Sequence, residues 1–421
     1  MRIFLLGADG FIGRHIACHL RQHGHHVLAC ARHPEALARM GFETMTADLE
    51  KPVAWEQALQ GYDAIVNAAG LLNGSEPRMR AVHQDGPAEV YAAAKAAKLR
   101  KIVLISAVGL EADTPFARHR RAGEAVAKAA GIPAVILRPS MVLGESSYGG
   151  SSLLRALAAL PYVSPVVGHG AQEFDPIHVD DLAAAVRQGI ESDDLNGQII
   201  SPSGPERVTQ TKLITATRAW LGRPQARVWR LPLPLARAMG WIGDRLKLGP
   251  ISSAAVRQLE QGVTADYAAF TTSTGQRPRG VSEILAQRPS GSQDLWHARL
   301  YLLRPVIRFT LLFMWLVSGF VGLFLPPERF LDGLSGVPLS GEVLTIAARA
   351  AGFIDVAIAL GLLLAWRLPK LALIQMAMVG GYTLAFGLMA PALWLEPYGG
   401  LLKNLPILCL ILVHKILEEE R

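Results

Sequence analysis

Three glycines near the start of the chain have the spacing of an anion-binding turn. Gly7, Gly10 and Gly13 follow the short apolar run RIFLL at residues 2–6. In such a turn the first glycine permits a tight bend, the second lets the backbone approach a pyrophosphate, and the third lets helix and strand pack closely. A helix that begins at the turn directs its free N–H groups at the anion. The spacing therefore predicts a Rossmann-type β-α-β unit that holds a dinucleotide.

Two later stretches would complete that site. Asn67-Ala68-Ala69-Gly70 ends another apolar run, and its small side chains allow a cofactor to lie against the edge of a sheet. Asp48 and Leu49 follow an expected third strand and would flank the adenine.

The end of the second strand bears on which dinucleotide binds. This strand normally ends in an acid that binds the adenosine ribose, whereas here it ends in Cys30-Ala31-Arg32-His33. The guanidinium of Arg32 suits a 2′-phosphate, so NADP(H) is favoured and NAD(H) is possible. The alternative is that Arg32 is a solvated loop cation, as most surface arginines are.

Short apolar runs alternate with helical patterns over the first half of the chain. The expected strands are 2–6, 26–30, 63–67, 101–106 and 133–138, and the expected helices are 11–22, 52–60, 86–99 and 117–130. This alternation predicts an α/β fold, a Rossmann-type doubly wound parallel sheet within a domain at residues 1–298. Residues 151–298 are less regular and would add a small extra lobe that contacts substrate.

Beyond residue 299 the composition changes to that of a membrane domain. Residues 309–325 and 371–390 carry no charge, and 343–366 and 401–417 are strongly apolar. Each run is near the ~20 residues needed to cross a bilayer, so residues 299–421 are predicted to form a four-helix transmembrane bundle. The expected spans are near 305–325, 343–366, 371–391 and 399–417. The alternative is a buried helical bundle in a large soluble protein.

Flanking charges orient those spans. Arg299, Arg304 and Arg308 precede the first span, and Arg367 and Lys370 lie between the second and third. By the positive-inside rule the N-terminal domain and the C-terminus would be cytoplasmic. The Ala- and Arg-rich composition suggests a bacterial plasma (inner) membrane, crossed several times.

The bulk composition excludes some classes of protein. The net charge is +7, and no basic run has interleaved aromatic residues, so a nucleic-acid partner is not indicated. Cys18, Cys30 and Cys409 lie far apart, which indicates neither a disulfide framework nor a zinc site, and no metal is expected. The lipid bilayer is the expected partner.

Residues 1–290 resemble the extended and atypical short-chain dehydrogenase/reductase superfamily. The likeness is to its epimerase-like branch, which includes the nucleotide-binding accessory subunit of respiratory complex I. It rests on GADGFIG, VNAAG, VLISAVG, ILRPSMVLG and PIHVDDLAAA, in that order. The resemblance implies pyrophosphate contacts from Gly7 to Gly13, including Phe11 and Ile12, and contacts to the middle of the cofactor from Ala68, Ala69 and Gly70. It places Ser106 at the family's catalytic Ser/Thr and Pro139 with Ser140 beside the nicotinamide.

The family's catalytic pair is replaced in this chain. Active members carry a proton-donating Tyr and a Lys four residues later, and the aligned positions here hold Phe116 and Arg120. Phe has no proton to give, while Arg120 can still bind ribose or phosphate. Among nearby groups His119 is a candidate acid or base, although most such histidines are surface residues. His178, Asp180 and Asp181 resemble a catalytic site, but in the family this stretch is structural, and its helix-starting acids would cap a helix at residues 182–190.

The C-terminal region resembles DoxX-like four-helix membrane domains, mainly through Lys403-Asn404-Leu405-Pro406. Charges inside a membrane usually have a function. Asp355 would be the charge deepest in the membrane, and its carboxyl group is expected to be either neutral or bonded to a cation such as Arg349 or Lys403. These three residues would either fix helix packing or contact an oligomer, a membrane partner, a polar headgroup or a quinone.

Two functions follow from these observations. The first is a membrane-anchored, NADP(H)-dependent oxidoreductase that acts on a lipid-soluble or quinone-like substrate. The second is a non-catalytic nucleotide-binding accessory or redox-sensing protein, for which Phe116 and Arg120 are no obstacle.

Overall fold

The computed structural model describes residues 1–72, 74–246, 248, 251–331, 336–396 and 399–419. The chain divides into two compact units. The N-terminal unit comprises residues 1–244 and 249–298, and the C-terminal unit comprises residues 245–248 and 299–421. Each is described separately below.

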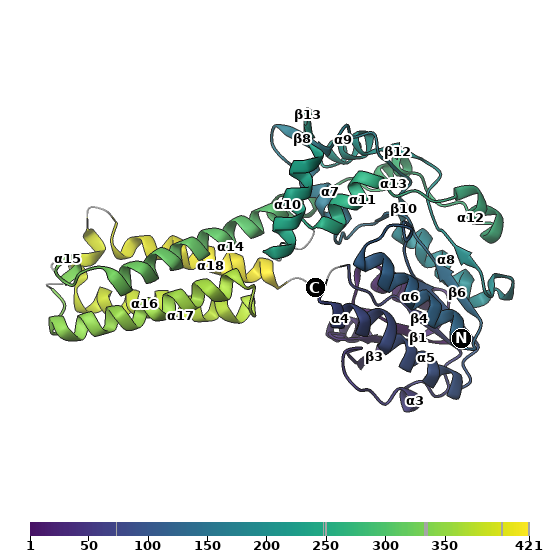
Figure 1. Ribbon diagram of the computed structural model, residues 1–421, viewed down its shortest axis with the longest axis horizontal. Coiled ribbons are helices and arrows are strands. Elements are labelled where there is room, and N and C mark those ends of the chain that lie inside the picture. The colour runs from purple at the N-terminus through teal and green to yellow at the C-terminus, as the bar shows by residue number, and fades with distance from the viewer. Residues whose placement is uncertain (73, 247, 249–250, 332–335, 397–398, 420–421) are drawn as a thin grey trace. The chain divides into compact units, whose positions relative to one another are not determined.

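A seven-stranded parallel sheet forms the centre of the N-terminal unit (Figure 1). Its strand order is β11-β6-β5-β4-β1-β2-β3, and every pairing within it is parallel. The strands are β1 (Arg2–Leu6), β2 (His26–Ala31), β3 (Glu43–Thr46), β4 (Ala64–Asn67), β5 (Lys101–Ile105), β6 (Ala134–Leu137) and β11 (Ile199–Ile200). The predicted Rossmann-type sheet is therefore confirmed, and the switch in strand order falls beside β1.

Helices cover both faces of this sheet, because each central strand buries alternate side chains on opposite sides. In β1, Ile3 and Leu5 join one apolar core, while Phe4 and Leu6 join the other. The first core is covered by α1 (Phe11–Gln22), α8 (Val179–Glu191) and α12 (Tyr267–Thr274). The second is covered by α3 (Trp55–Ala58), α5 (Gly86–Ala96) and α6 (Pro115–Ala129). The short segments α2 (Glu35–Arg39), α4 (Glu76–Arg80) and the π-helix η1 (Ala81–Asp85) complete this part.

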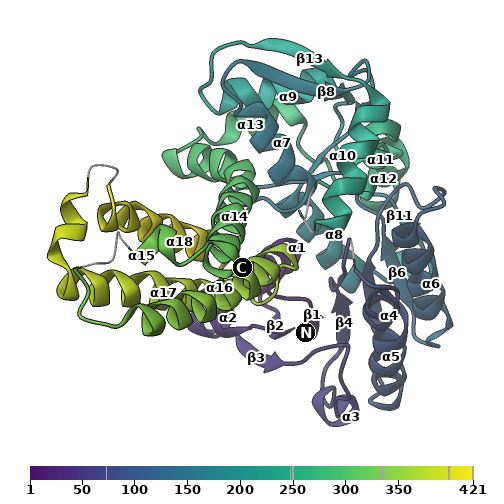
Figure 2. The same cartoon turned by 60° about the vertical axis from the view of Figure 1, so that its left-hand side comes forward.

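A second lobe follows β6 and has its own apolar core, which includes Leu154, Phe174 and Leu213. Its strands pair two by two, and β8 runs beside β13 in Figure 2. The strands are β7 (Val142–Leu143), β8 (Val163–Val167), β9 (Glu173–Phe174), β10 (Ile177–His178), β12 (Val208–Thr209) and β13 (Arg227–Leu231). The lobe's helices are α7 (Gly150–Ala158), α9 (Gln210–Trp220), α10 (Leu233–Arg245), α11 (Ser253–Gln261) and α13 (Val281–Gln287), and the turn η2 (Asp193–Leu195) follows α8.

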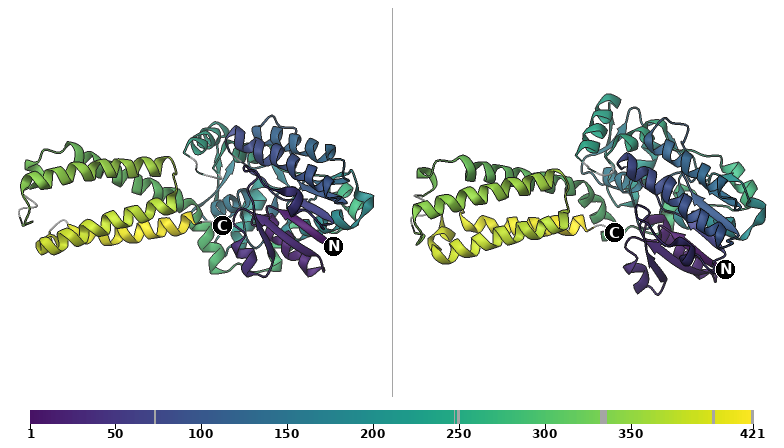
Figure 3. Two further views of the ribbon diagram at one scale, coloured as in Figure 1. Left: turned by 90° about the horizontal axis from the view of Figure 1, so that it is seen from below. Right: turned by 60° about the horizontal axis from the view of Figure 1, so that its bottom comes forward.

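The C-terminal unit is helical, and its long helices run side by side in Figure 3. Three helices of the described chain are long and apolar enough to cross a membrane: α14 (Ser292–Phe324), α16 (Gly341–Leu363) and α17 (Leu368–Met389). A fourth, α18 (Asn404–Glu418), has 15 residues and is shorter than a typical span. The connections contain α15 (Glu328–Leu331), η4 (Pro391–Leu395) and η5 (Leu401–Lys403).

Glycines allow α14 and α16 to approach closely. A Cβ on Gly352 would lie 2.9 Å from the backbone nitrogen of Leu323, and one on Gly322 would lie 2.9 Å from the Cα of Gly352. Neither position can hold a side chain without separating the helices. Small residues at the crossing are the usual way in which membrane helices gain packing contact.

Of the two states expected for Asp355, the ion pair with Arg349 or Lys403 is not formed among the residues that the structure describes. Arg349 donates to the backbone oxygens of Gly322 (2.7 Å) and Leu325 (2.8 Å). Asp355 instead accepts a 2.6 Å hydrogen bond from the Ser318 hydroxyl. The reason is local, because the end of α14 leaves carbonyl groups without helical partners and a guanidinium satisfies two of them. Lys403 is exposed.

Candidate nucleotide and substrate site

The turn between β1 and α1 has the geometry of a phosphate cradle. Gly7 has φ +73° and donates its N–H to the Cys30 carbonyl at 2.9 Å. A Cβ there would lie 2.6 Å from the Ala69 nitrogen, and one on Gly13 would lie 2.1 Å from the Gly7 oxygen. Both positions therefore require glycine, one for its φ and its close approach to β4, the other for helix packing.

The N-terminus of α1 is open to an anion. Gly10 precedes the helix, offers no side-chain cap, and no acidic residue lies in the first turn. The N–H groups at the start of the helix therefore remain available to a ligand. In the parallel register Leu6 lies beside both Cys30 and Asn67, so the ends of β1, β2 and β4 meet at this edge of the sheet.

Ala68, Ala69 and Gly70 form the facing wall. Asn67 fixes this stretch, since its Oδ1 accepts the Ala69 N–H at 3.0 Å and its Nδ2 donates to the Tyr91 hydroxyl at 2.8 Å. Ala68 and Ala69 are half-buried and Gly70 is exposed. The structure thus brings the glycine turn and the small-residue stretch together, as a bound dinucleotide requires.

Arg120 lies against the same wall. Its Nη1 donates to the Ile105 carbonyl at 2.9 Å, and a Cβ on Gly70 would lie 2.2 Å from its Nη2. Its Nε is buried and has no hydrogen-bond partner among the residues described. Burial lowers the pKa of Arg120 to about 10, which still leaves the guanidinium charged at neutral pH. A cation with an unsatisfied donor at Gly70, on the wall that faces the glycine turn, fits an anionic cofactor. The ring of Phe116 lies 5.5 Å from the guanidinium carbon of Arg120.

Ser106 is engaged in a buried polar cluster. Its hydroxyl donates to Glu124 at 2.6 Å, and Arg138 binds both oxygens of that carboxylate at 2.8 and 2.6 Å. Burial by itself would raise the pKa of Glu124, but the hydrogen bonds from Arg138 and Ser106 outweigh it, and the pKa is lowered. Ser106 is 4% exposed, so its hydroxyl is buried and stabilises the Glu124 carboxylate. Glu124 and Arg138 were not singled out from the sequence, since no short motif links positions 14 residues apart.

His119 lies between helices. One ring nitrogen is 3.0 Å from a carboxylate oxygen of Glu76, and the other is 2.6 Å from the amide of Gln84. Its ring is 5% exposed. It is not among the residues that line the two cavities described below.

The remaining adenosine-side residues lie at separate points. Arg32 follows the last residue of β2 and is exposed. The carboxylate of Asp48 accepts the Glu50 N–H at 3.1 Å and stabilises the turn after β3. Leu49 is half-buried, and a Cβ on Gly86 would lie 2.9 Å from its Cβ. The structure does not bring these residues together with Arg120.

An apolar cavity of about 240 Å³ begins at the glycine turn and extends into the second lobe. Phe11 and Ile12 from α1 and Pro139 and Ser140 after β6 line one part of it. The lobe supplies a largely aliphatic wall: Met141, Leu153, Leu154, Leu157, Phe174, Leu213, Ile214 and Leu259. Of the polar groups on the wall, Ser140 donates to the Asp175 carbonyl at 2.6 Å, while the Tyr148 side chain is 67% exposed.

A second cavity of about 450 Å³ adjoins the first and shares Val108, Gln258 and Val263 with it. Phe116 and Arg257 line this more polar space. Sequence reasoning missed Tyr148, Arg257 and the aliphatic wall, because the lobe has no periodic motif that reveals which of its side chains face inward.

The N-terminus of α8 is capped by the imidazole of His178 and not by the acidic side chains that were expected to cap it. His178 Nδ1 accepts the Asp180 N–H at 3.2 Å, and Arg279 binds Asp181 at 2.8 Å. Arg279 also approaches His178 Nδ1 at 2.9 Å, and burial lowers the pKa of His178. This arrangement gives the stretch a structural role.

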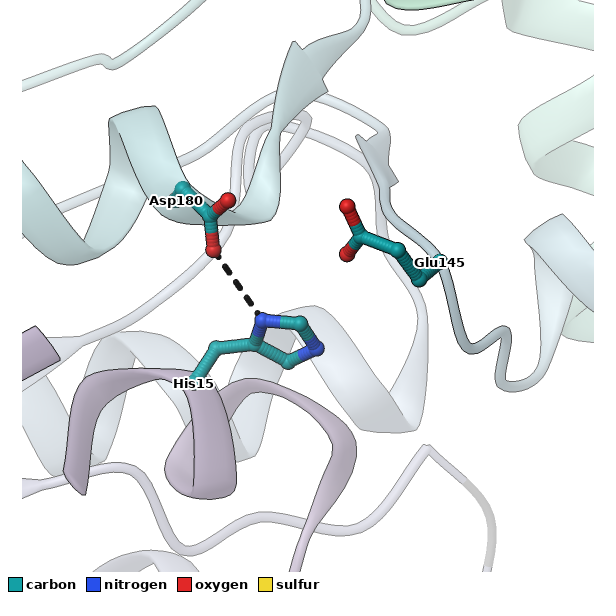
Figure 4. Close-up of side chains that lie close together, drawn as sticks. All are labelled: His15, Glu145 and Asp180. Carbon is teal, nitrogen blue, oxygen red and sulfur yellow. Dashed lines mark hydrogen bonds and ion pairs between the residues drawn. The ribbon is translucent and has the colours of Figure 1, made fainter. Parts of the chain in front are cut away.

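Figure 4 shows a neighbouring group in which Asp180 and Glu145 both lie near His15. Their ligand atoms fall within 4.8 Å of one another, a spacing that a metal ion could bridge. His15 Nδ1 already bonds to Asp180 at 3.1 Å, and this contact lowers the pKa of that carboxyl. Arg279, which attracts Asp180 and Glu145 electrostatically, already binds Asp181.

Comparisons with known proteins agree with this geometry. Residues 7–155 match the NAD(P)H-binding family, and residues 312–412 match the DoxX-like family. Ceramide reductase of Caulobacter vibrioides is 29% identical over 248 residues, which cover 58% of this chain and 77% of that protein.

The mitochondrial NADH dehydrogenase [ubiquinone] 1 alpha subcomplex subunit 9 of Arabidopsis thaliana is 25% identical over 251 residues, covering 56% of this chain and 61% of that protein. The solved structure of MoeE5 with UDP-glucuronic acid and NAD superposes with a TM-score of 0.54 at 20% identity, covering 68% of this chain and 97% of that one. That level of identity supports the fold alone. The chain therefore carries a Rossmann-type domain that resembles NAD(P)H-binding proteins over residues 7–155, followed by a helical domain that resembles the DoxX-like family over residues 312–412.

Proposed function

We propose that this protein is a membrane-anchored, NADP(H)-dependent oxidoreductase that reduces or oxidises a lipid-soluble or quinone-like substrate. The observation that carries the proposal is the apolar cavity of about 240 Å³, which starts at Phe11 and Ile12 of the nucleotide turn. An apolar cavity next to the cofactor suits a hydrophobic substrate. The relative named ceramide reductase supports a lipid as the class of substrate.

Different residues of the chain are assigned to cofactor binding and to proton donation. When bound, NADP(H) supplies or accepts a hydride. The turn from Gly7 to Gly13 binds the pyrophosphate, and Arg120 holds the ribose or phosphate from the facing wall. Reduction of a carbonyl also needs a proton at its oxygen, which Phe116 cannot give. Tyr148, one of the residues that line the apolar cavity, is the donor that we assign.

The turnover experiment uses the full chain in nanodiscs, with NADPH and either a quinone or a long-chain ketone as acceptor. We expect acceptor-dependent oxidation of NADPH, and a fall in kcat of about 100-fold in Tyr148→Phe, the scale of a lost proton donor. Tyr162→Phe is the matched control, since Tyr162 is 84% exposed and lines neither cavity.

One observation favours a second function. Phe116 and Arg120 at the family's Tyr and Lys positions suit a non-catalytic protein in which bound nucleotide stabilises the fold or reports redox state to a membrane partner. Tight NADPH binding without turnover of either acceptor would establish this second function in place of the first. In that case Tyr148→Phe and Ser106→Ala should leave NADPH binding unchanged.

We further propose that NADP(H) is preferred over NAD(H) through Arg32. Replacing Arg32 by alanine is expected to weaken NADPH binding about 10- to 100-fold, because a charge-assisted hydrogen bond contributes roughly 1.5–3 kcal/mol. NADH lacks the 2′-phosphate, so its affinity should not change. Isothermal titration with both nucleotides measures this, and Arg39→Ala, an exposed arginine on α2, is the control. Equal losses for NADH and NADPH would contradict the assignment.

The division of the chain and its orientation belong to the same proposal. The boundary between 1–298 and 299–421, with the small lobe mainly at 151–298, is supported by the two compact units. Four crossings of the plasma (inner) membrane would put the N-terminal domain and the C-terminus in the cytoplasm, as Arg299, Arg304 and Arg308 in the N-terminal half of α14 favour. Among the intramembrane charges, Lys403 is exposed and is the residue that we propose for contact with an oligomer or membrane partner.

A further inference from the structure

Helix α10 presents its large apolar residues outward. Leu235, Met239 and Ile242 are 48%, 42% and 44% exposed, and their spacing of four and three residues puts them on one face. Trp229, on the strand that leads into this helix, is 51% exposed. A surface helix of a soluble protein normally turns such a face inward.

The inward face of α10 consists of small residues. Ala236 is 1% exposed, and a Cβ on Gly240 would lie 3.0 Å from the Cα of Ser253. A Cβ on Gly243 would lie 1.7 Å from the Ile251 oxygen. The helix therefore sits directly on the segment that follows it, and it cannot roll its large residues inward without losing this packing.

The surrounding sequence is cationic. Residues 223–246 contain five arginines and one acid, Asp244. Arg227 and Arg230 flank Trp229 and are exposed, whereas Arg237 is paired with Glu260. An apolar helical face with aromatic and arginine side chains around it has the composition of a surface that lies on an anionic membrane.

The same chain contains a helix that can anchor this unit to a membrane. α14 begins at Ser292, and its apolar part is long enough to span a bilayer. The N-terminal unit is thereby tethered at a high effective concentration near the lipid surface, so even a weak interfacial contact would be populated.

We infer that Trp229 and the Leu235–Met239–Ile242 face of α10 insert into the interface of the bilayer, while Arg227 and Arg230 contact anionic lipid headgroups. This contact is adjacent to the substrate cavity. Ala236 belongs to a small apolar core with Val256 and Leu259 of α11, and Leu259 also lines the cavity. Contact of α10 with the lipid surface would thus support α11, the helix that packs against α10 and lines one wall of the cavity.

The test places a fluorophore on the face by Met239→Cys in the full chain, reconstituted into phosphatidylcholine vesicles with 30% phosphatidylglycerol. Cys18 and Cys409 are replaced by serine, and the buried Cys30 stays in place because it is shielded from the label. Lipids with a spin label near the headgroup report contact by quenching. Met40→Cys is the control, since Met40 is 51% exposed and lies after α2 in the same unit.

We expect several-fold stronger quenching at position 239 than at position 40. The difference should shrink in vesicles of phosphatidylcholine alone and in the Arg227→Glu/Arg230→Glu variant, whose unchanged NADPH affinity confirms its fold. Equal quenching at both positions would overturn the inference. Shielding of position 239 from aqueous iodide without lipid quenching would overturn it too, because a second copy or another part of the chain would then cover the face. Neither readout depends on turnover, so failure of the proposed reaction leaves this test intact.

Discussion

Replacing Gly13 by alanine is expected to weaken NADPH binding by about 100-fold or more. The new Cβ would lie 2.1 Å from the Gly7 oxygen, a distance that no packed pair of atoms adopts, so the turn must move by about an ångström. A misplacement of that size in a positioning element costs on the order of 100-fold. Fluorescence titration of the full chain in detergent measures the loss.

Two glycine variants separate binding from folding. Gly189→Ala lies in α8 of the same unit, where the nearest side-chain atoms would be 3.5 Å away, so binding should be unchanged and the helix slightly more stable, by about 0.5–1 kcal/mol. Gly10→Ala puts a methyl group at the open end of α1, 3.3 Å from the Gly7 oxygen, and should weaken binding while the thermal midpoint is kept. Wild-type affinity in Gly13→Ala would refute the proposed cradle.

Replacing Arg138 by methionine is expected to destabilise the N-terminal unit by about 3–5 kcal/mol, the usual cost of leaving a buried charge without its partner. Glu124 is 3% exposed, and Arg138 supplies two of its hydrogen bonds. For a unit of this size the change corresponds to a fall in Tm of roughly 5–8 °C, measured by differential scanning fluorimetry.

The matched control is Arg118→Met, which breaks the exposed pair of Arg118 with Asp113 and should cost at most about 1 kcal/mol. Adding Glu124→Gln to Arg138→Met removes the uncompensated charge and should recover most of the lost stability. If Arg138→Met and Arg118→Met shifted Tm equally, the buried pair would contribute no more than a surface pair.

The same pair predicts acid sensitivity. The pKa of Glu124 is lower in the folded protein than in the unfolded chain, so its contribution to stability is present above the unfolded pKa of about 4.3. It is lost as the pH falls through the lower folded value. The Glu124→Gln/Arg138→Met variant should therefore lose less stability than the wild type on acidification below pH ~4.3, as urea unfolding at several pH values would record.

The membrane charges show how neighbouring backbone groups outweigh a distant opposite charge. Asp355 and Arg349 lie about one and two-thirds turns apart on α16, a spacing that puts their side chains on different faces of the helix. Arg349 instead binds two carbonyls at the end of α14, and Ser318 of α14 reaches Asp355. The sequence contains no signal for these choices, because they depend on how closely Gly322 and Gly352 let the two helices approach.

The sequence by itself determined the features that depend on neighbours along the chain. Alternating apolar runs specified β1, β2, β4, β5 and β6 of the sheet, and the spacing of Gly7, Gly10 and Gly13 specified the turn, because strand pattern and glycine conformations are local properties. The long uncharged runs likewise specified membrane helices, since length and hydropathy are read directly from composition.

Only the tertiary structure decided the features that join distant segments. It brought Ser106 and Arg138 to Glu124, set Arg120 against Gly70, and built the apolar cavity from α1, α7, α9 and α11. It also turned the large residues of α10 outward, which a helical pattern alone cannot reveal, because the inward face is chosen by close packing on Ile251 and Ser253. The nucleotide turn was local and could be predicted, whereas the substrate cavity depends on packing between distant segments and could only be observed.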